Sequence, residues 1–297
     1  MGRMSGSWTL LGAPLDSSGA GRGEERAPVA LRAGGLVESL GLEDAGDVVP
    51  PLRDARRDPA SGVIAAEQLA AASVALRDAV AATLRRGARP FVLGGDCSIL
   101  PGALAGARIA RGPLSLWMVD GHPDALDGES SPTGEAADMD LAIVLGRGAP
   151  ALTRLAGTVP IVEPERVALV GHRPGTLGAD VAAELAQVPP AVTQTTAPEV
   201  RARGAAEVAR TILAAGGNQP AWLHLDLDAL DSEELPAVTY TQPQGLFWDE
   251  LVELVRPLLT APSLVGISLA DFEPDRDPGA DHARRVVEAL RIAWPLR

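Results

Sequence analysis

Short apolar runs alternate with longer amphipathic segments along the chain. A short apolar run suits a buried strand, whereas apolar residues three and four positions apart suit a helix that packs on one side. These patterns predict strands at residues 8–13, 90–94, 114–120, 166–171, 221–228 and 264–271. They predict helices near residues 63–86, 100–110, 139–145, 178–187, 199–215, 249–259 and 280–293.

The alternation of strands and helices predicts an α/β protein. Strands that are apolar throughout suit a mostly parallel sheet whose two faces are both covered by helices. No repeat, low-complexity linker or change in composition divides the chain. We therefore expect residues 1–297 to form a single domain with a three-layer α/β/α, doubly wound architecture.

Polar and reactive side chains cluster where the predicted strands end. The run "WMVDGHPD" places Asp120, His122 and Asp124 at every second position, and an extended chain points such residues to one side. The run "HLDLDALD" repeats this spacing with Asp226 and Asp228. Ligands of open α/β sheets bind beyond the carboxyl ends of the strands. The sequence therefore predicts a functional site at that edge of the sheet.

A group of four aspartates and one histidine favours a metal site. Ionised carboxylates cannot share a partly buried pocket without cations, because their repulsion and desolvation oppose it. Hard carboxylate oxygens with one imidazole suit Mn²⁺ or a similar ion better than Ca²⁺. A single aspartate at a strand end is more often a helix cap or a loop carboxylate. Two such motifs on separate strands point to metal binding instead.

Composition and charge narrow the possible functions. The net charge of −13 disfavours nucleic acid and anionic lipid as partners. Every basic side chain is an arginine, which excludes lysine-based Schiff-base and phosphate-loop chemistry. The single cysteine, Cys97, allows no intrachain disulfide, and no apolar stretch has the length of a membrane span or a signal peptide. We expect a cytoplasmic protein that acts on a small molecule.

Five motifs resemble those of the ureohydrolases, the arginase/agmatinase family of binuclear manganese enzymes. The segment "GAPLDSSGAGRGEERAPVALR" resembles the family's opening motif, "GGDCS" its G-G-D-H-S, "DGHPD" its D-A-H-x-D, "HLDLDALD" its S-x-D-x-D-x-x-D-P and "DFEP" its E-x-N-P. The resemblance covers almost the whole chain. It implies an arginase-like fold, two Mn²⁺ ions and hydrolysis of a C–N bond in a guanidino or amidine compound, with release of urea or a urea analogue. It also implies a homo-oligomer, a trimer or a hexamer.

The same resemblance implies which residues bind the metals. One ion would be held by Cys97, Asp120, Asp124 and Asp226. The second would be held by His122, Asp120, Asp226 and Asp228, so that two aspartates bridge the ions.

Catalytic roles are implied by position as well. In the family a hydroxide that bridges the metals attacks the substrate carbon, and metal binding brings the pKa of the parent water towards neutrality. Asp124 would orient this hydroxide and carry its proton to the leaving nitrogen. Asp271 would face the guanidinium. Asp231, His224 and Glu273 are weaker candidates for supporting a ligand or contacting substrate, and a buried histidine without a functional role is the alternative for His224.

Two positions depart from the family pattern near the metals. Cys97 stands where a histidine ligand is usual. A thiolate is softer and favours Zn²⁺ over Mn²⁺, so other divalent ions are also candidates, and a buried cysteine that acts as a small hydrophobe is the alternative. Ala137 stands where the family carries a histidine that shuttles protons to the leaving group. The leaving nitrogen therefore needs another proton source or an easier expulsion.

Other departures concern the far end of the substrate. Leu126, Pro174 and Thr176 occupy positions where arginases place residues that bind the amino-acid end of arginine. We therefore expect a substrate other than free L-arginine. Arg173 and His172 could instead meet an acidic or neutral tail.

Two alternative functions remain open from the sequence. The same metal site could hydrolyse another C–N bond, such as an amide. A degenerate, non-catalytic scaffold with the ureohydrolase fold is the non-enzymatic alternative, although the retention of five ligand residues speaks against it.

Overall fold

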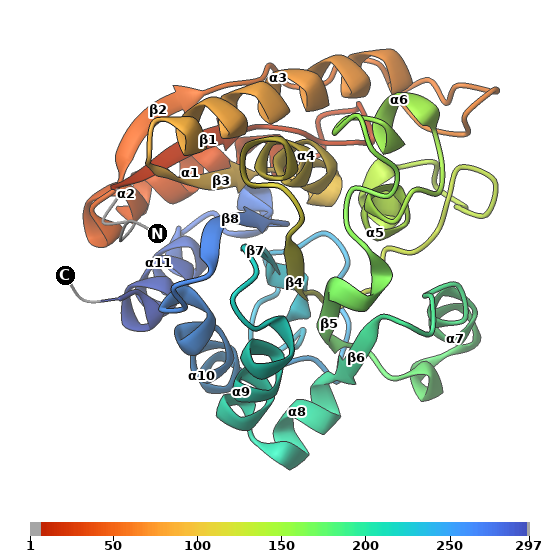
Figure 1. Ribbon diagram of the computed structural model, residues 1–297. Coiled ribbons are helices and arrows are strands. Elements are labelled where there is room, and N and C mark those ends of the chain that lie inside the picture. The colour runs from red at the N-terminus through yellow and green to blue at the C-terminus, as the bar shows by residue number, and fades with distance from the viewer. Residues whose placement is uncertain (1–6, 296–297) are drawn as a thin grey trace.

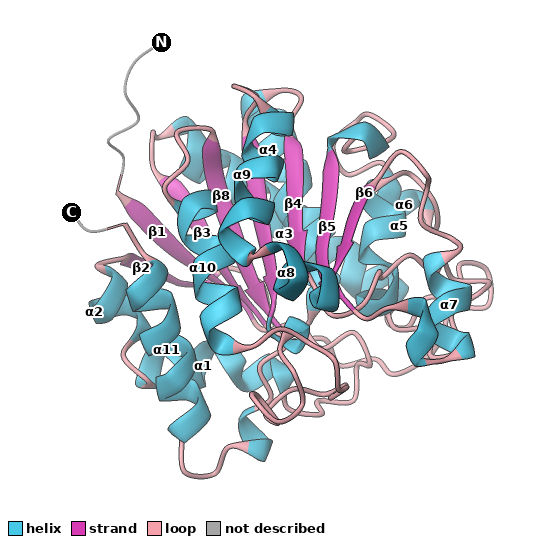
Figure 2. Ribbon diagram, turned by 90° about the horizontal axis from the view of Figure 1, so that it is seen from below, coloured by secondary structure: helices cyan, strands magenta, loops and turns pink. Residues whose placement is uncertain are grey.

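A single parallel sheet forms the centre of the molecule (Figures 1 and 2). The computed structural model describes residues 7–295. Within this range eight strands pair in the order β2-β1-β3-β8-β7-β4-β5-β6, and all their pairings are parallel. The strands are β1 (Trp8–Ala13), β2 (Glu43–Asp47), β3 (Arg89–Gly94), β4 (Ser115–Val119), β5 (Val167–His172), β6 (Thr193–Thr196), β7 (Ala221–Asp226) and β8 (Leu264–Ala270).

Helices cover both faces of this sheet (Figure 2). One face packs against α1 (Ala27–Ala33), α2 (Leu36–Leu40), α8 (Ala197–Arg203), α9 (Ala205–Gly216), α10 (Trp248–Leu259) and α11 (Asp281–Ala293). The other face packs against α3 (Ala66–Arg85), α4 (Leu100–Arg111), α5 (Asp140–Val144) and α6 (Pro150–Thr153). The helix α7 (Ala179–Leu185) lies near the β6 edge (Figure 1). This arrangement confirms the predicted three-layer α/β/α fold.

The buried strands could be predicted from their apolar sequence, whereas two edge strands were not predicted. All six predicted strands are present, with ends that differ from the prediction by two residues or fewer. The missed strands, β2 with the sequence EDAGD and β6 with TQTT, lie at the two edges of the sheet and are largely exposed. An edge strand needs backbone pairing on one side only and no apolar face, so hydrophobic patterning does not reveal it.

The helices α1, α2 and α6 were also not predicted. Each has seven residues or fewer and leaves little periodicity to read, although α5 and α7, which are as short, were predicted as residues 139–145 and 178–187. The helix predicted over residues 199–215 is interrupted. Gly204 has a φ of 89°, a conformation that favours glycine, and it separates α8 from α9. A capping box between Thr196 and Glu199 fixes the start of α8. Among residues 7–295 there is no helix whose length and hydrophobicity would let it span a bilayer.

Candidate metal centre

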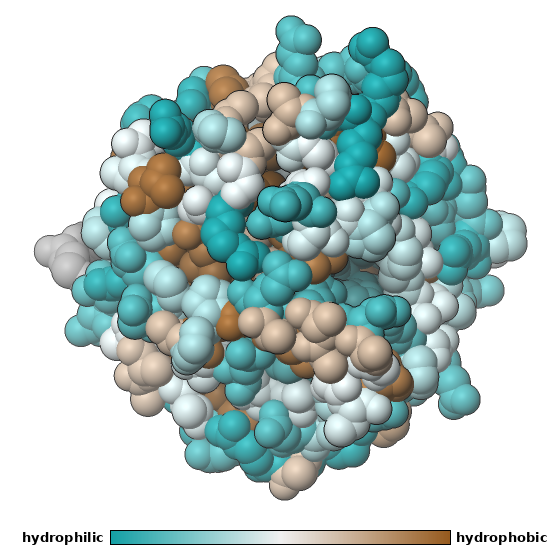
Figure 3. Space-filling view, turned by 90° about the vertical axis from the view of Figure 1, so that its right-hand side faces the viewer, coloured by the Kyte–Doolittle hydropathy of each residue, from teal (hydrophilic) through white to brown (hydrophobic). Residues whose placement is uncertain are grey.

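The predicted site residues meet beyond the carboxyl ends of four adjacent strands, β3, β8, β7 and β4. Six of them line a cavity of about 630 Å³. Its lining includes Cys97, His122, Asp124, Asp226, Asp228 and Asp271. Figure 3 shows the side of the molecule on which α7 lies; this face is largely hydrophilic and is hollowed near its centre. The parallel sheet thus brings together residues that are far apart in the sequence.

The turn after β3 holds Cys97 in place. Gly95 packs so closely against the chain that an added Cβ would lie 1.7 Å from the backbone oxygen of Leu15, so a side chain there is excluded. Asp96 then caps a short 3₁₀ turn by accepting a hydrogen bond from the backbone N–H of Ser98 (3.1 Å). It also accepts one from the backbone N–H of Ser17 (2.5 Å), in the N-terminal loop. The "GGDCS" run therefore packs against the N-terminal loop and presents the thiol of Cys97 to the cluster.

Possible metal ligands fall into overlapping groups whose donor atoms lie within 4.8 Å of one another. One group contains Cys97, Asp120, Asp124 and Asp226, a second contains Asp120, His122 and Asp228, and a third contains Asp226, Asp228 and Asp271. The thiol of Cys97 lies 2.5 Å from Asp226 Oδ2, and His122 Nδ1 lies 2.6 Å from Asp228 Oδ2. The first two groups contain every residue that the sequence nominated as a metal ligand.

The carboxylates of this centre lack the partners that would stabilise their ionised forms. Asp120 is fully buried, and its Oδ2 has no hydrogen-bond partner in the described part of the chain. Burial and the neighbouring Asp228 raise the pKa of Asp120, and burial with the charge of Asp120 raises the pKa of Asp124. The pKa of Asp226 is raised by burial and by Asp228. Such a set of acids fits bound cations, which supply the missing positive charge.

The pKa of Asp228 moves in the opposite direction. Burial alone would raise it, but the imidazole of His122 and the guanidinium of Arg173 together lower it to about 2. The same contact with Asp228 outweighs burial and raises the pKa of His122. This histidine–aspartate pair is therefore the one part of the cluster that is charge-balanced by protein groups alone.

We expect the metal-free protein to lose stability as the pH rises above about 4, the ordinary pKa of an aspartate. Asp120, Asp124, Asp226 and Asp271 have raised pKa values in the folded state. The unfolded chain releases these protons first, so the folded state binds more protons and its free energy of unfolding falls across this range. Asp228, with its lowered pKa, acts in the opposite sense only below about pH 4. Melting temperatures of metal-stripped protein across this range measure the effect. Saturating Mn²⁺ should abolish the decline, and a metal-free protein that becomes more stable over the same range would contradict the expectation.

Both residues expected to take part in catalysis have an unusual backbone conformation. Asp124 has a φ of 45° and Asp271 a φ of 64°, in the left-handed region that few residues other than glycine adopt. Backbone strain of this kind is concentrated at functional sites, where the surrounding structure maintains it. Asp271 Oδ1 is also buried and has no hydrogen-bond partner among residues 7–295, so it is available to a ligand in the cavity.

None of the three weaker candidates, Asp231, His224 and Glu273, belongs to the cavity lining. Asp231 accepts backbone hydrogen bonds from Glu233 and Gly245. Glu273 accepts one from Asp275. His224 is different, because its Nε2 lies 3.2 Å from the thiol of Cys97.

The expected role of Arg173 at the substrate tail is wrong. Its guanidinium is buried and donates hydrogen bonds to the backbone oxygens of Asp228, Leu230 and Gln242, at 2.7–2.8 Å. The buried ring of His172 contacts the backbone oxygen of Arg173, at 2.9 Å from Nδ1. Satisfied in this way, Arg173 fixes the loops behind the metal centre and does not reach the cavity.

Several functional candidates were missed by sequence reasoning. Arg22 lines the cavity and forms a bidentate contact with Glu135, at 3.0 and 2.6 Å. Asp180 and Glu184, from α7, also line the cavity. A fully buried aspartate, Asp140, lies beside His224. Asp140, Asp180 and Glu184 belong to no strand-end motif, and Arg22 lies in the "GAPLDSSGAGRGEERAPVALR" segment without having been singled out there.

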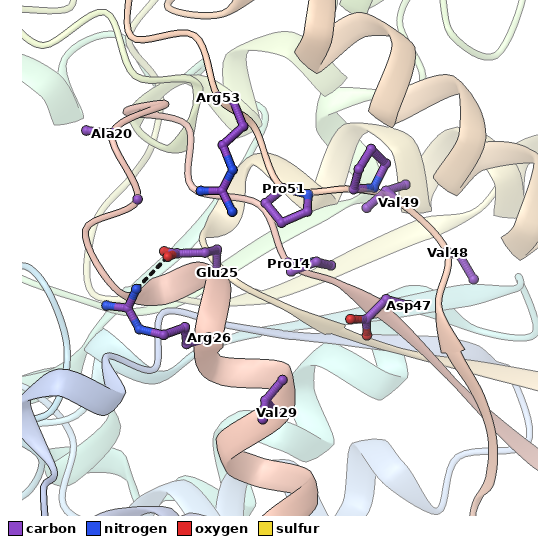
Figure 4. Close-up of a pocket in the computed structure, with 12 residues that line it drawn as sticks. Pro14, Ala20, Glu25, Arg26, Val29, Asp47, Val48, Val49, Pro51 and Arg53 are labelled. Carbon is purple, nitrogen blue, oxygen red and sulfur yellow. Dashed lines mark hydrogen bonds and ion pairs between the residues drawn. The ribbon is translucent and has the colours of Figure 1, made fainter.

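A second hollow of about 750 Å³ lies beside β1 and α1 (Figure 4). Its wall includes Glu25 and Arg26, which form an ion pair at 2.7 Å. Its described lining contains none of the groups of metal-ligand residues given above. The chemistry of the described residues is therefore concentrated in the first cavity.

Comparison with known proteins agrees with this geometry. The model of the arginase family matches residues 7–294. An arginase from Bacillus caldovelox is 32% identical over 279 residues, which cover 91% of each chain. The chain belongs to the arginase family.

Solved structures support the family assignment. The arginase structure from Bacillus caldovelox aligns with a TM-score of 0.87 at 29% identity, covering 98% of this chain and 99% of the other. Formimidoylglutamase from Bacillus subtilis shares the fold, with a TM-score of 0.75 at 20% identity over 97% of this chain and 86% of the other. The resemblance to ureohydrolases is confirmed, and the chain is an enzyme of this hydrolase family.

Proposed function

We propose that the protein hydrolyses a C–N bond of a guanidino or amidine compound at a binuclear metal centre and releases urea or a urea analogue. The observation that carries this proposal is the position of Asp271, whose buried and unpartnered carboxylate oxygen shares a cavity with the cluster of metal-ligand residues. A carboxylate beside a pair of cations suits a planar, positively charged group, which it can bind through two hydrogen bonds.

The donor set fits two divalent ions, with Mn²⁺ preferred. By position, one ion would be held by Cys97, Asp120, Asp124 and Asp226, and the other by His122, Asp120, Asp226 and Asp228. The unpartnered Oδ2 of Asp120 supports this assignment, because a buried carboxylate oxygen without a protein donor is available to a cation. When bound, the ions would activate water as the nucleophile at neutral pH.

The chain's own residues then position the reactants. Asp271 orients the guanidinium, so that its carbon faces the metal centre. Asp124, whose carboxylate lies in the group with Cys97 and Asp226, accepts a proton and delivers it to the leaving nitrogen. Ala137 lines the cavity without a group that could share this task. The proposal therefore favours a leaving group that departs easily.

Recognition of the substrate tail would combine apolar and charged contacts. Leu126 lines the cavity and offers no polar atom to an amino-acid end. The carboxylates of Asp180 and Glu184 would attract a cationic tail, and Arg22 would attract an acidic one. We propose that this wall favours a guanidino compound other than free L-arginine.

A substrate panel tests the proposed function. Steady-state assays of urea release with Mn²⁺-loaded protein should compare L-arginine, agmatine, guanidino acids and N-hydroxyguanidines. We expect one of the last three classes to give the highest kcat/KM, by about tenfold or more over L-arginine, because the cavity lacks the full set of polar partners for an amino-acid end. The highest kcat/KM for L-arginine would show that the tail-binding wall has been misassigned, and no release from any compound would favour amide hydrolysis or a non-catalytic scaffold.

We further propose that the enzyme works in the cytoplasm as a homo-oligomer, a trimer or a hexamer, on a small-molecule substrate. The strongly acidic composition supports the absence of nucleic acid and anionic membranes as partners. The oligomeric state rests on the family resemblance.

A further inference from the structure

Three side chains converge behind the carboxylate cluster, at positions that do not belong together in the sequence. Cys97 follows β3, His224 lies within β7, and Asp140 begins α5. The thiol of Cys97 lies 3.2 Å from His224 Nε2, which in turn lies 3.7 Å from Asp140 Oδ2. One donor atom from each residue lies within 4.8 Å of the other two.

Asp140 is the least expected member of this group. It is fully buried, and neither of its carboxylate oxygens has a hydrogen-bond partner within residues 7–295. A buried carboxylate without partners is costly, because nothing replaces the water it has lost. Its nearest charged-group contact is the imidazole of His224, at a distance too long for a hydrogen bond. The carboxylate of Asp140 is therefore buried beside a histidine and has no hydrogen-bond partner among the described residues.

His224 is oriented as a ligand by the residues behind it. Its Nδ1 lies 2.7 Å from the hydroxyl of Ser268, which also accepts a hydrogen bond from the indole of Trp222 at 3.0 Å. A serine oxygen has two lone pairs, so it can accept from both rings. When Nδ1 carries the proton, Nε2 keeps its lone pair and aims it at Cys97 and Asp140. Histidine ligands of metals are held by this kind of contact at the other ring nitrogen.

We propose that Cys97, His224 and Asp140 form a distinct site for a soft divalent ion of the zinc type. Sulfur, imidazole nitrogen and one carboxylate oxygen are donors that zinc accepts in tetrahedral geometry, and three protein ligands leave a fourth position open. We call this set the inner site. Cys97 then serves the zinc-type ion, and the carboxylates and His122 serve the harder Mn²⁺ ions.

The inner site deepens the proposed function, because it rests on the metal centre and changes the partner assigned to Cys97. Two arrangements share this thiol. In one, Cys97 would bind a metal ion together with Asp124 and Asp226. In the inner site, it would bind one together with His224 and Asp140. Variants of Asp124, His224 and Asp140 therefore distinguish the two.

Cadmium titration of the metal-stripped, full-length protein tests the inner site. Cd²⁺ resembles Zn²⁺ as a soft ion and gives an ultraviolet thiolate-to-metal absorption band that reports sulfur ligation directly. We expect the parent to develop this band on binding Cd²⁺ and to lose it on addition of Zn²⁺ but not of excess Mn²⁺. His224→Gln and Asp140→Asn should each weaken Cd²⁺ binding by at least about tenfold, since even the loss of a group that only supports a ligand has that effect.

Two control variants complete the experiment. Asp138→Asn alters a carboxylate that lines the same cavity but is held by the hydroxyls of Ser131 and Thr133, each at 2.7 Å, and it should keep the parent's Cd²⁺ affinity. Asp124→Asn should also keep the thiolate band. A Zn²⁺-induced rise in melting temperature, present in the parent and Asp138→Asn but lost in His224→Gln and Asp140→Asn, gives an independent readout.

The inner site is overturned if the parent shows no thiolate band. It is also overturned if His224→Gln and Asp140→Asn bind Cd²⁺ as tightly as the parent, and loss of the band in Asp124→Asn alone would assign the thiol to the outer carboxylates. Should one inner-site variant fail to fold, the other decides, because Asp140→Asn keeps the shape of the side chain. None of these outcomes depends on turnover, so they are separate from the substrate panel that tests the proposed function.

Discussion

Replacement of Asp226 by alanine is expected to abolish both metal binding and activity. Its two carboxylate oxygens face different parts of the centre, since Oδ2 lies 2.5 Å from the thiol of Cys97 and Oδ1 accepts the backbone N–H of Asp228 at 2.6 Å. It is a proposed ligand of both ions, so its loss would remove a ligand from each. A metal centre supplies several kcal/mol of transition-state stabilisation, and its loss should lower kcat/KM by about 1,000-fold or more.

Elemental analysis after Mn²⁺ loading and gel filtration measures the first effect, and urea release measures the second. We expect the metal content to fall from two ions per chain to near zero. Asp231→Asn is a matched control from the same sequence run, because Asp231 binds only backbone N–H groups outside the cavity lining. A parent protein that holds no Mn²⁺ would contradict the binuclear centre itself, and unchanged Mn²⁺ content in Asp226→Ala would remove this residue from the ligands.

Replacement of Asp271 by asparagine is expected to impair the substrate step without removing the metals. Asparagine is the substitution of choice because, like aspartate, it tolerates the left-handed conformation at this position, where φ is 64°. The variant keeps the shape of the side chain but loses the charge that pairs with a guanidinium. Loss of one partner of a buried charge pair costs about 2–5 kcal/mol, which corresponds to a fall in kcat/KM of about 30- to 4,000-fold.

Steady-state kinetics with the best substrate of the panel, together with the Mn²⁺ content of the same samples, separates this role from metal binding. Glu273→Gln is the matched control, because Glu273 lies in the same "DFEP" run but accepts a backbone hydrogen bond from Asp275 and does not line the cavity. If Glu273→Gln lost activity and Asp271→Asn kept it, Glu273 and not Asp271 would be the residue that contacts the guanidinium. A loss of Mn²⁺ from Asp271→Asn would make Asp271 a metal ligand.

The contact between Arg22 and Glu135 bears on the choice of substrate. Both residues line the cavity, and the ring of Tyr240 lies 6.0 Å from the guanidinium carbon of Arg22. Arg22 is thus held in place by Glu135 and the aromatic ring, and it also lies 3.7–3.8 Å from the carboxylates of Asp16 and Glu24. It supplies positive charge to a wall that also contains Asp180 and Glu184, so both signs of charge are available to a substrate tail.

The proximity of the proposed metal-ligand residues could be predicted because they obey a local rule. Asp120, His122 and Asp124 follow one apolar strand at alternating positions, and Asp226 and Asp228 end another. Parallel strands bring their carboxyl ends to one edge, so the spacing and the topology together imply proximity. The order of the strands was not predicted, yet β3, β8, β7 and β4 prove to be neighbours, which is why all four motifs share one cavity.

The inner part of the site could not be predicted in this way. Asp140 begins a helix of five residues, and its sequence neighbours give no sign that it is fully buried beside His224. Arg173 shows the opposite error, because a loop position beside the site suggested substrate contact while its guanidinium is fully used by backbone oxygens. The direction in which a side chain points and the groups it hydrogen-bonds to depend on packing between distant segments.

The sequence by itself determined the α/β class, the six buried strands and the carboxylate motifs that end two of them, because burial and side-chain alternation are properties of short runs. Only the tertiary structure decided the edge strands, the break at Gly204 and the wall built from Arg22, Asp180 and Glu184. It also decided that His224 faces Cys97 and Asp140. These features arise from contacts between residues far apart in the chain, whose energies no local pattern contains.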